Sequence, residues 1–97
     1  MSGPASSTIH LKVISPRRLL ADVDVESVSL PSLEGEIGIL PGHRPLFVGI
    51  GKGLVRFRAQ GEEETLAVDG GYAQVQPNEV LVMTDVGEHE DSGDVAG

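Results

Sequence analysis

Apolar and polar residues alternate along most of the chain with a period of two, the pattern of strands that bury one face. Ile9, Leu11 and Val13 show it first, and Pro16 ends this strand because proline cannot donate to a β-ladder. The same reasoning predicts strands over residues 22–30, 37–40, 46–50, 72–76 and 79–84, and a hairpin over 53–69. No window of a dozen residues has helical spacing, so the pattern predicts an all-β protein.

Along the second predicted strand, the apolar residues change from odd-numbered to even-numbered positions. Val23 and Val25 are apolar at odd positions, whereas Val28 and Leu30 are apolar at even positions. A strand with a two-residue period cannot make this change without an extra residue. The sequence therefore predicts a β-bulge or a strand break near residues 26–27.

The predicted hairpin turns at Gln60-Gly61, and a two-residue turn would place Arg58 opposite Glu63. Such a cross-strand ion pair contributes ~0.2–1 kcal/mol. The same register points Glu64 toward the inner face, which is unfavourable for a carboxylate. A longer turn with a shifted register is therefore the alternative.

Turns follow one another closely, because the chain contains 13 glycines and 6 prolines. Eight or so short strands joined in this way favour an antiparallel sandwich or barrel. The strand over 79–84 is apolar on both faces, which predicts a central position in its sheet. The 97 residues suffice for one domain, and with only 3% aromatic residues the core must consist of Val, Leu, Ile and Ala.

Composition and charge exclude several classes of protein. The absence of cysteine excludes disulfides, thiolate zinc sites and a cysteine nucleophile, and it weakly favours a reducing compartment. No apolar run approaches the ~20 residues of a membrane span, and the start does not read as a secretory signal. We expect a soluble, cytoplasmic protein.

The net charge of −8 is concentrated toward the end of the chain, where five acids from Asp85 onward have no Lys or Arg among them. We expect a flexible N-terminus at residues 1–7, one folded domain at 8–85 and an acidic disordered tail at 86–97. Nucleic acid and anionic lipid both require a basic face, so the charge argues against either as a partner.

Ionisable residues supply few candidates for chemistry. His10, His43 and His89 are too far apart in sequence to suggest a metal pair, and we predict neither a metal nor a cofactor. Glu34 and Glu36, two residues apart in a glycine-bounded loop, are one candidate pair of catalytic carboxylates.

Two further segments have a chemical and a simpler interpretation. The acids Asp22, Asp24 and Glu26 would bind a cation or act in acid/base chemistry, or they form the solvated face of an amphipathic strand. The glycine-rich run at 49–53 precedes a strand and not a helix, so it is interpreted as a flexible turn and not as a phosphate loop. These residues indicate an interaction module, and no catalytic residue is predicted.

Two longer segments carry a resemblance to a known family. Residues 32–46 read SLEGEIGILPGHRPL, and residues 69–80 read DGGYAQVQPNEV. Together with residues 9–16, 26–28 and 53–56, they are similar to the N-terminal domain of ATP synthase ε subunits. The similarity runs from about residue 8 to residue 85.

The resemblance implies a flattened antiparallel β-sandwich of about ten short strands. It also implies a non-catalytic central-stalk subunit that binds the γ subunit and the c-ring, and so couples proton translocation to ATP synthesis. Such a subunit is peripheral to the cytoplasmic side of the cell (inner) membrane through the complex, without inserting into lipid.

Individual contacts follow by carrying the family pattern onto matching positions. The resemblance implies c-ring contacts at Glu34, Gly35 and Glu36. It implies γ contacts at Ser15, His43 and Arg44. We expect these positions to be exposed loop groups on a rigid scaffold, with the carboxylates facing basic groups on the ring.

The chain departs from the family pattern after residue 85. Family members typically continue into two helices that inhibit the catalytic head and in some cases bind ATP. Residues 86–97 contain three glycines and few apolar residues, so we expect neither an inhibitory helical hairpin nor ATP sensing through this chain. The alternatives are a stand-alone β-sandwich ligand-binding module, and a small β-barrel enzyme that uses the acids at 22–26 or 34–36.

Overall fold

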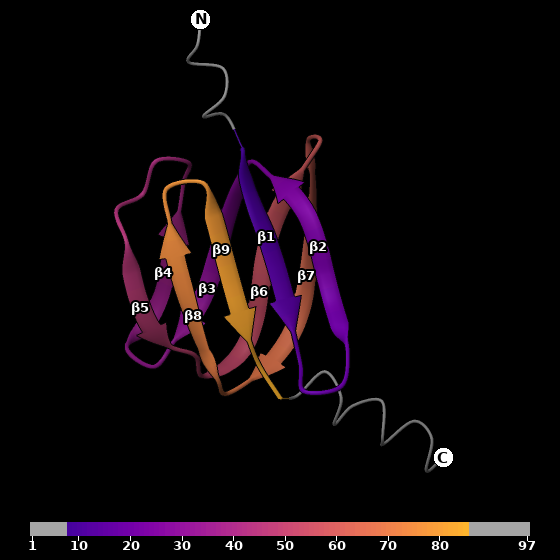
Figure 1. The fold of residues 1–97 in the computed structure, drawn as a ribbon, viewed down its shortest axis with the longest axis vertical. Coiled ribbons are helices and arrows are strands. Elements are labelled where there is room, and N and C mark those ends of the chain that lie inside the picture. The colour runs from indigo at the N-terminus through magenta and orange to yellow at the C-terminus, as the bar shows by residue number, and fades with distance from the viewer. Residues whose placement is uncertain (1–7, 86–97) are drawn as a thin grey trace, which may run out of the picture.

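A computed structural model of the protein describes residues 8–85, which form nine strands and no helix (Figure 1). The strands are β1 (Ile9–Ile14), β2 (Leu19–Val25), β3 (Ser27–Ser32), β4 (Gly35–Ile39), β5 (Leu46–Gly49), β6 (Lys52–Ala59), β7 (Glu62–Asp69), β8 (Tyr72–Gln76) and β9 (Glu79–Met83). The predicted all-β class is confirmed. The expected flexible N-terminus and acidic tail lie outside the described residues, and the described part of the chain contains no helix that could cross a membrane.

The strands form two sheets that pack face to face as a sandwich. One sheet has five strands in the order β2-β1-β9-β8-β5, and the other has four in the order β4-β3-β6-β7. The two-face apolar strand β9 is the middle strand of the larger sheet, as its sequence predicted. Every pairing between neighbouring strands is antiparallel except β1–β9, which is parallel.

The β1–β9 pairing is the one parallel pairing among the named strands of the otherwise antiparallel sandwich. Leu11 pairs with Val80 and Val13 with Val82, so the first and last strands run in the same direction. The amide of His10 extends the ladder by donating to the Asn78 carbonyl at 2.9 Å. Because most of the domain separates the two strands in sequence, no tight turn forces them to be antiparallel.

The predicted change of parity is a strand break at which the chain passes between sheets. β2 ends at Val25 in the larger sheet, and β3 begins at Ser27 in the smaller one. Val25 and Val28 are both buried, but they reach the core from opposite sides. The switch from odd to even apolar positions is therefore the signature of the crossing.

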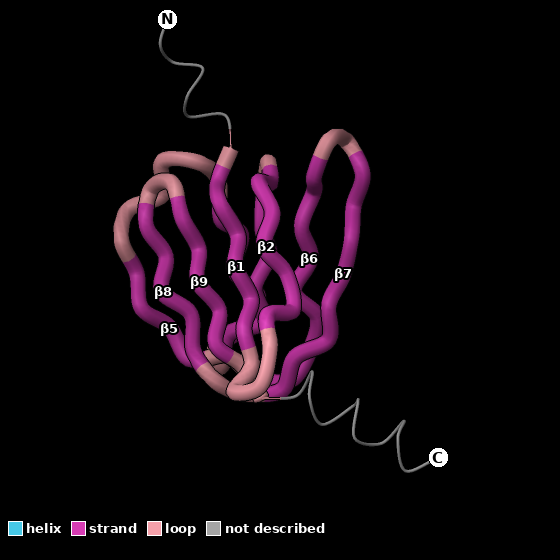
Figure 2. Tube along the Cα trace, turned by 45° about the vertical axis from the view of Figure 1, so that its right-hand side comes forward, coloured by secondary structure: helices cyan, strands magenta, loops and turns pink. Residues whose placement is uncertain are grey.

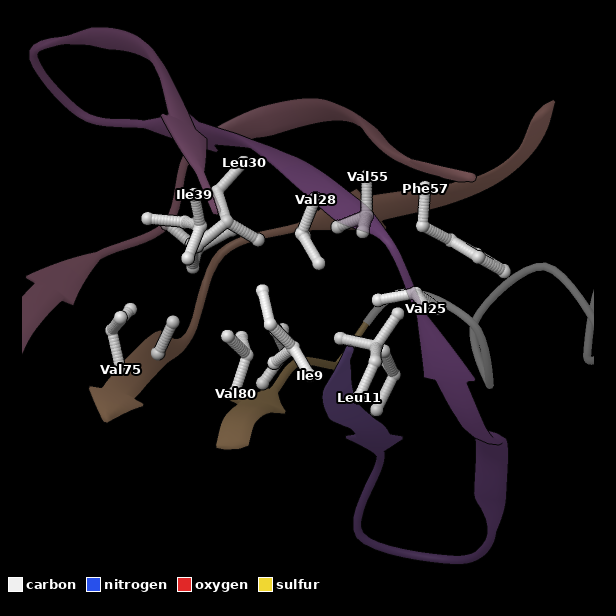
Figure 3. Close-up of a cluster of buried hydrophobic side chains, with 14 of the residues drawn as sticks. Ile9, Leu11, Val25, Val28, Leu30, Ile39, Val55, Phe57, Val75 and Val80 are labelled. Atoms are coloured by element: carbon white, nitrogen blue, oxygen red, sulfur yellow. The ribbon is translucent and has the colours of Figure 1, made fainter. Parts of the chain in front are cut away.

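The core lies between the sheets and is almost entirely aliphatic (Figure 3). Its buried members are Ile9, Leu11, Val13, Val25, Val28, Leu30, Ile39, Ile50, Val55, Phe57, Val68, Ala73, Val75, Val80 and Val82. Phe57 is its only aromatic member among the described residues. Each fully buried Val, Leu or Ile side chain contributes roughly 1.5–3 kcal/mol, so β-branched side chains suffice to hold the sheets together.

The β6–β7 hairpin has the unshifted two-residue turn. Gln60 and Gly61 both have positive φ, 56° and 80°, as a type I′ turn requires. Arg58 pairs with Glu63, and its Nη2 lies 3.7 Å from Glu63 Oε1, so the predicted pair is confirmed. The shifted register is wrong: Glu64 does lie opposite Phe57, but it remains exposed.

The glycine-rich run at 49–53 is not the flexible turn that we expected. Ile50 is 1% exposed, and its amide donates to the Gly71 carbonyl at 2.9 Å. The amide of Gly51 donates to the Pro31 carbonyl at 2.7 Å. This segment is an extended crossing from β5 in one sheet to β6 in the other, held on both sides by backbone hydrogen bonds.

All strands run between two ends of the sandwich, which we call lower and upper as they are oriented in Figure 1. The lower end carries the β1–β2, β3–β4 and β7–β8 turns. The upper end carries the β4–β5 loop and the β6–β7 and β8–β9 turns. Sites on turns at opposite ends are therefore separated by the full length of the strands.

Candidate functional site

The β3–β4 turn at the lower end holds Glu34, one of the three residues expected to face the c-ring, and Gly35 follows as the first residue of β4. Ser32 Oγ donates to the Gly35 carbonyl at 2.5 Å and accepts from the Glu34 amide at 3.1 Å. Gly35 has φ +124°, a conformation that side chains other than glycine rarely adopt. The turn is thus fixed by its own hydrogen bonds, with the exposed Leu33 and Glu34 at its tip.

Glu36, the third of these residues, lies on a strand and not in the loop. It is the second residue of β4, and its Oε2 accepts a hydrogen bond from Ser29 Oγ at 2.5 Å. Together with Arg56 and Arg58 it lines a hollow of about 530 Å³ on the outer face of the four-stranded sheet. Glu34 lies in the turn before this strand, so the two carboxylates belong to different elements.

The β4–β5 loop at the upper end positions His43 and Arg44. The Gly42 amide donates to the Pro77 carbonyl at 2.8 Å, which ties the loop to the β8–β9 turn. The His43 amide donates to the Leu40 carbonyl at 3.1 Å, and His43 Nδ1 lies 2.7 Å from the Arg44 carbonyl oxygen. Arg44 is exposed on a loop that the backbone holds in place.

Ser15 is not the exposed loop group that we expected. It is only 8% exposed, and its hydroxyl accepts from the amides of Arg17 and Arg18 at 3.4 and 3.2 Å. The same hydroxyl lies 3.3 Å from the Arg18 carbonyl, to which it donates. Ser15 therefore shapes the β1–β2 turn at the lower end, whereas His43 lies at the upper end.

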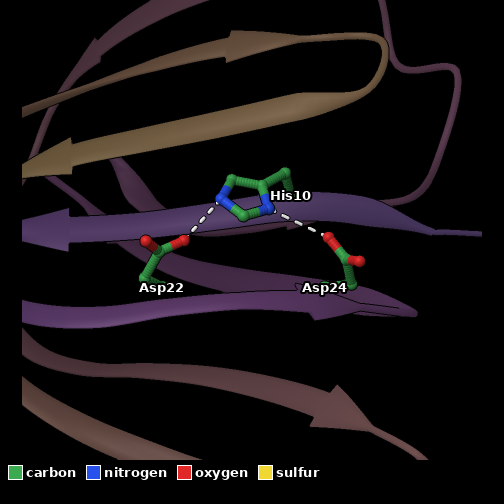
Figure 4. A network of polar contacts seen from close by, with 3 residues as sticks. All are labelled: His10, Asp22 and Asp24. Atoms are coloured by element: carbon green, nitrogen blue, oxygen red, sulfur yellow. Dashed lines mark hydrogen bonds and ion pairs between the residues drawn. The ribbon is translucent and has the colours of Figure 1, made fainter.

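A histidine between two carboxylates forms the densest polar cluster on the larger sheet (Figure 4). His10 Nε2 lies 2.5 Å from Asp22 Oδ1, and Nδ1 lies 2.9 Å from Asp24 Oδ1. The hydrogen bond to Asp24, with Asp22 adding to it, raises the pKa of His10 above its usual value. Two carboxylates in these positions stabilise the protonated ring, in which both nitrogens can donate.

Sequence reasoning treated His10 and the row of acids separately, and so missed their contact. Asp22 and Asp24 are not simply a solvated strand face, because antiparallel pairing of β1 and β2 places His10 directly opposite Asp24. Glu26 lies beyond the end of β2 and takes no part in the cluster. Within residues 8–85, no three His, Cys, Asp or Glu side chains are arranged to hold a metal ion.

An apolar strip crosses the outer face of the five-stranded sheet at its lower end, and we call it the outer band. It consists of Leu19, Ile14, Met83, Tyr72 and Phe47. Pairing places Met83 between Ile14 and Tyr72, and the Tyr72 and Phe47 ring centroids lie 5.2 Å apart. Phe47 is 65% exposed. Adjacent exposed apolar side chains of this kind commonly mark a surface that another protein covers.

The outer band was not predicted from the sequence. Period-two alternation assigns these residues to the outward face but does not show which strands are neighbours. The strand order brings together positions that are far apart in the chain, such as Ile14 and Met83.

Comparison with known proteins gives a consistent result over the described domain. Residues 8–90 match the family described as "ATP synthase, Delta/Epsilon chain, beta-sandwich domain". The ATP synthase epsilon chain of Carboxydothermus hydrogenoformans is 39% identical over 87 residues, which cover 90% of this chain and 65% of that protein. The ATP synthase epsilon chain of a Synechococcus species is 42% identical over 89 residues, covering 92% and 65%. This chain thus spans about 65% of the length of these relatives.

Solved structures show the same fold at lower identity. A chain in the cryo-EM structure of the Euglena gracilis mitochondrial ATP synthase superposes with a TM-score of 0.74 at 23% identity, covering 80% of this chain and 51% of that one. A chain in the central stalk and c-ring structure of the Tetrahymena thermophila mitochondrial ATP synthase gives 0.64 at 13% identity, covering 79% and 63%.

Proposed function

The chain belongs to the ATP synthase delta/epsilon chain family through its β-sandwich domain, and on this premise we propose that it is a non-catalytic central-stalk subunit. In this role it binds the γ subunit and the c-ring and couples proton translocation to ATP synthesis. It acts on the cytoplasmic side of the membrane, which it reaches through the complex.

The family match over residues 8–90 is the observation that carries the proposal. It includes all nine strands, so the likeness concerns the whole folded unit and not a short motif. Relatives called ATP synthase epsilon chain are 39–42% identical over nine tenths of this chain. Among the acids considered for chemistry, Glu36 accepts a hydrogen bond from Ser29, and Asp22 and Asp24 contact His10.

We assign γ to the outer face of the five-stranded sheet. The outer band adjoins Ser15 at the lower end, where Ile14, Tyr72 and Met83 share a hollow of about 310 Å³ with it. The loop that carries His43 and Arg44 leads directly into β5, on which Phe47 lies. On this assignment His43 and Arg44 contact γ beside β5 at the upper end, Ser15 acts through the shape of its turn at the lower end, and the outer band supplies apolar area.

The c-ring is assigned to the β3–β4 turn. Glu34 lies at the lower end in a turn fixed by Ser32, and Gly35 and Glu36 follow as the first two residues of β4. Exposed carboxylates on a fixed turn suit basic groups on a partner, where they contribute more to specificity and association rate than to affinity.

Calorimetric titration with the γ subunit of the same organism tests the proposal. We expect one-to-one binding. Phe47→Ser should weaken it about five- to tenfold, the effect of losing ~1–1.4 kcal/mol at a buried aromatic contact. Leu54→Ser is the matched control, because Leu54 is 40% exposed on the outer face of the other sheet. His43→Ala should weaken binding, and Glu36→Ala should leave it unchanged.

Failure of folded γ to bind the folded chain would overturn the central-stalk proposal. The ligand-binding alternative would then be favoured, with the 530 Å³ hollow beside Arg56 and Arg58 as its site. Equal losses for Phe47→Ser and Leu54→Ser would leave γ binding intact but would remove the assignment of γ to the outer band.

A further inference from the structure

A groove opens along one side of the sandwich, between the edge strands of the two sheets. β2 is the last strand of the larger sheet and β7 the last of the smaller one, and both lie on this side (Figure 2). The groove has a volume of about 280 Å³. Its lining includes Leu20 and Val23 from β2, Phe57 and Ala59 from β6, and Leu66 and Glu64 from β7. We call it the edge groove.

The edge groove exists because the inner face of β7 changes from apolar to acidic along its length. Val68 is buried and Leu66 half-buried, but Glu64 and Glu62, at the same parity, are exposed. Carboxylates cannot enter the core, so the β6–β7 hairpin stands apart from β2 toward the upper end. Across the sandwich β2 makes its main approach to β6.

Both edges of the groove lack a neighbouring strand within the described residues. A terminal strand presents a row of unpaired amides and carbonyls along its free side, which can template another strand. The groove floor is half-buried and apolar, with Leu20, Val23, Ala59 and Leu66 packed against the core yet accessible from outside. An extended segment placed there would gain backbone hydrogen bonds and cover apolar surface at the same time.

The charges around the edge groove select which segment can enter. The acids on the two edge strands and the adjoining break are Asp22, Asp24, Glu26, Glu62, Glu63, Glu64 and Asp69. Among the basic residues that face these acids, His10 contacts Asp22 and Asp24, Arg58 lies 3.7 Å from Glu63, and Lys12 is opposite Asp22 in the β1–β2 ladder. No ion pair joins Glu62 or Glu64 to another residue within 8–85.

Acids on an edge strand also protect it from pairing with a second copy of the same chain. Protection against self-pairing explains why this edge is acidic. It does not act against a basic strand, which is attracted by the same acids. A basic strand meets complementary charge at the same positions.

We propose that the edge groove receives an extended, basic segment of another polypeptide, added beside β7 as a fifth strand of the four-stranded sheet. Alternate side chains of the incoming segment point into the groove. There an apolar side chain covers Leu66 and Phe57, and a basic side chain pairs with Glu64. The side chains between them point to the outer face of the sheet, where they lie near Glu63. The proposal is independent of the stalk function and of its assigned γ and c-ring surfaces.

The test uses capped eight-residue synthetic peptides and the whole chain. A peptide of alternating Lys and Val should bind saturably by fluorescence anisotropy, and it should slow hydrogen exchange at the amides of β7. A Lys/Ser peptide should bind more weakly, because it lacks apolar side chains, and a Glu/Val peptide should not bind. Equal binding of the Lys/Val and Lys/Ser peptides, or no slowing at β7, would overturn the proposal.

Point variants locate the binding of the Lys/Val peptide. Glu64→Gln and Glu62→Gln should each weaken it about two- to fivefold, as expected for the loss of one exposed charge pair, and added salt should reduce the difference. Glu36→Gln is the matched control on β4, the opposite edge of the same sheet, and should change nothing. An effect of Glu36→Gln equal to that of Glu64→Gln would mean that the peptide follows overall charge and not the edge groove.

Discussion

At the scale of single residues, His10 makes the stability of the domain depend on pH. Its imidazolium lies between Asp22 and Asp24, with Lys12 beside it on β1 and Glu79 opposite on β9. The hydrogen bond to Asp24 raises the pKa of His10 in the folded state above the unfolded value of about 6.5. The stabilisation is therefore complete below about pH 6.5 and is lost as the pH rises through the folded-state pKa.

Urea unfolding of the wild type and of His10→Gln across this pH range measures the effect. The difference in unfolding free energy should be largest at acidic pH and shrink as the pH rises, because glutamine keeps hydrogen-bonding capacity but not the charge. His43 and His89 are present in both proteins and cancel in the difference. A difference that grows with pH would contradict the cluster geometry.

Two adjacent glycines in the β7–β8 turn allow the cost of a strained backbone to be measured apart from the cost of a steric clash. Gly70 and Gly71 have φ of +92° and +106°, but only at Gly71 would a Cβ meet backbone, 1.9 Å from the Met83 carbonyl oxygen. We expect Gly70→Ala to cost ~1–2 kcal/mol and Gly71→Ala at least ~1–3 kcal/mol more, since the neighbouring backbone must move. Urea unfolding of both variants checks this, and equal losses would rule out the close approach.

At the scale of elements, the β6–β7 turn holds a residue in an unfavourable conformation. Gln60 has φ 56°, which asparagine adopts more readily at the first central position of a type I′ turn. Gln60→Asn should stabilise the domain by ~0.5 kcal/mol, or ~2–4 °C in Tm. Gln74→Asn, in the middle of β8, is the control and should be neutral or destabilising. A lower Tm for Gln60→Asn would contradict the turn assignment.

Elements whose partners are close in sequence could be predicted, and those joined by distant segments could not. The alternation of apolar and polar residues, together with the turn residues, was enough to predict the β6–β7 hairpin and the break after Val25. The parallel pairing of β1 and β9, the contact of His10 with Asp22 and the outer band all depend on strand order, which local pattern does not contain.

The burial of Ser15 was not predicted either, because it depends on hydrogen bonds that the sequence pattern does not show. A serine before a proline has the sequence of an exposed turn, and its hydroxyl is buried only because it bonds the amides of Arg17 and Arg18. In the β3–β4 turn the exposed loop position of Glu34 was predicted correctly, but Gly35 and Glu36 already belong to β4.

At the scale of the whole molecule, the domain depends on its last strand as much as on its first. β9 lies between β1 and β8 at the centre of the larger sheet and supplies the buried Val80 and Val82. A chain ending at Asn78 should therefore fail to fold, whereas one ending at Asp85 should retain its β-sheet signal and cooperative urea transition by circular dichroism. Folding of the shorter chain would contradict the central position of β9.

The position of β4 also has a mechanical meaning. The turn at Glu34 and the loop beginning at Leu40 lie at opposite ends of this one strand, whose five residues extend over roughly 17 Å. A force that pulls these two ends apart acts along a backbone that is already extended. The hydrogen bonds between β4 and β3 lie perpendicular to this force, so they are loaded in shear and all at once. The domain should therefore be stiff along this axis and transmit a displacement with little elastic loss.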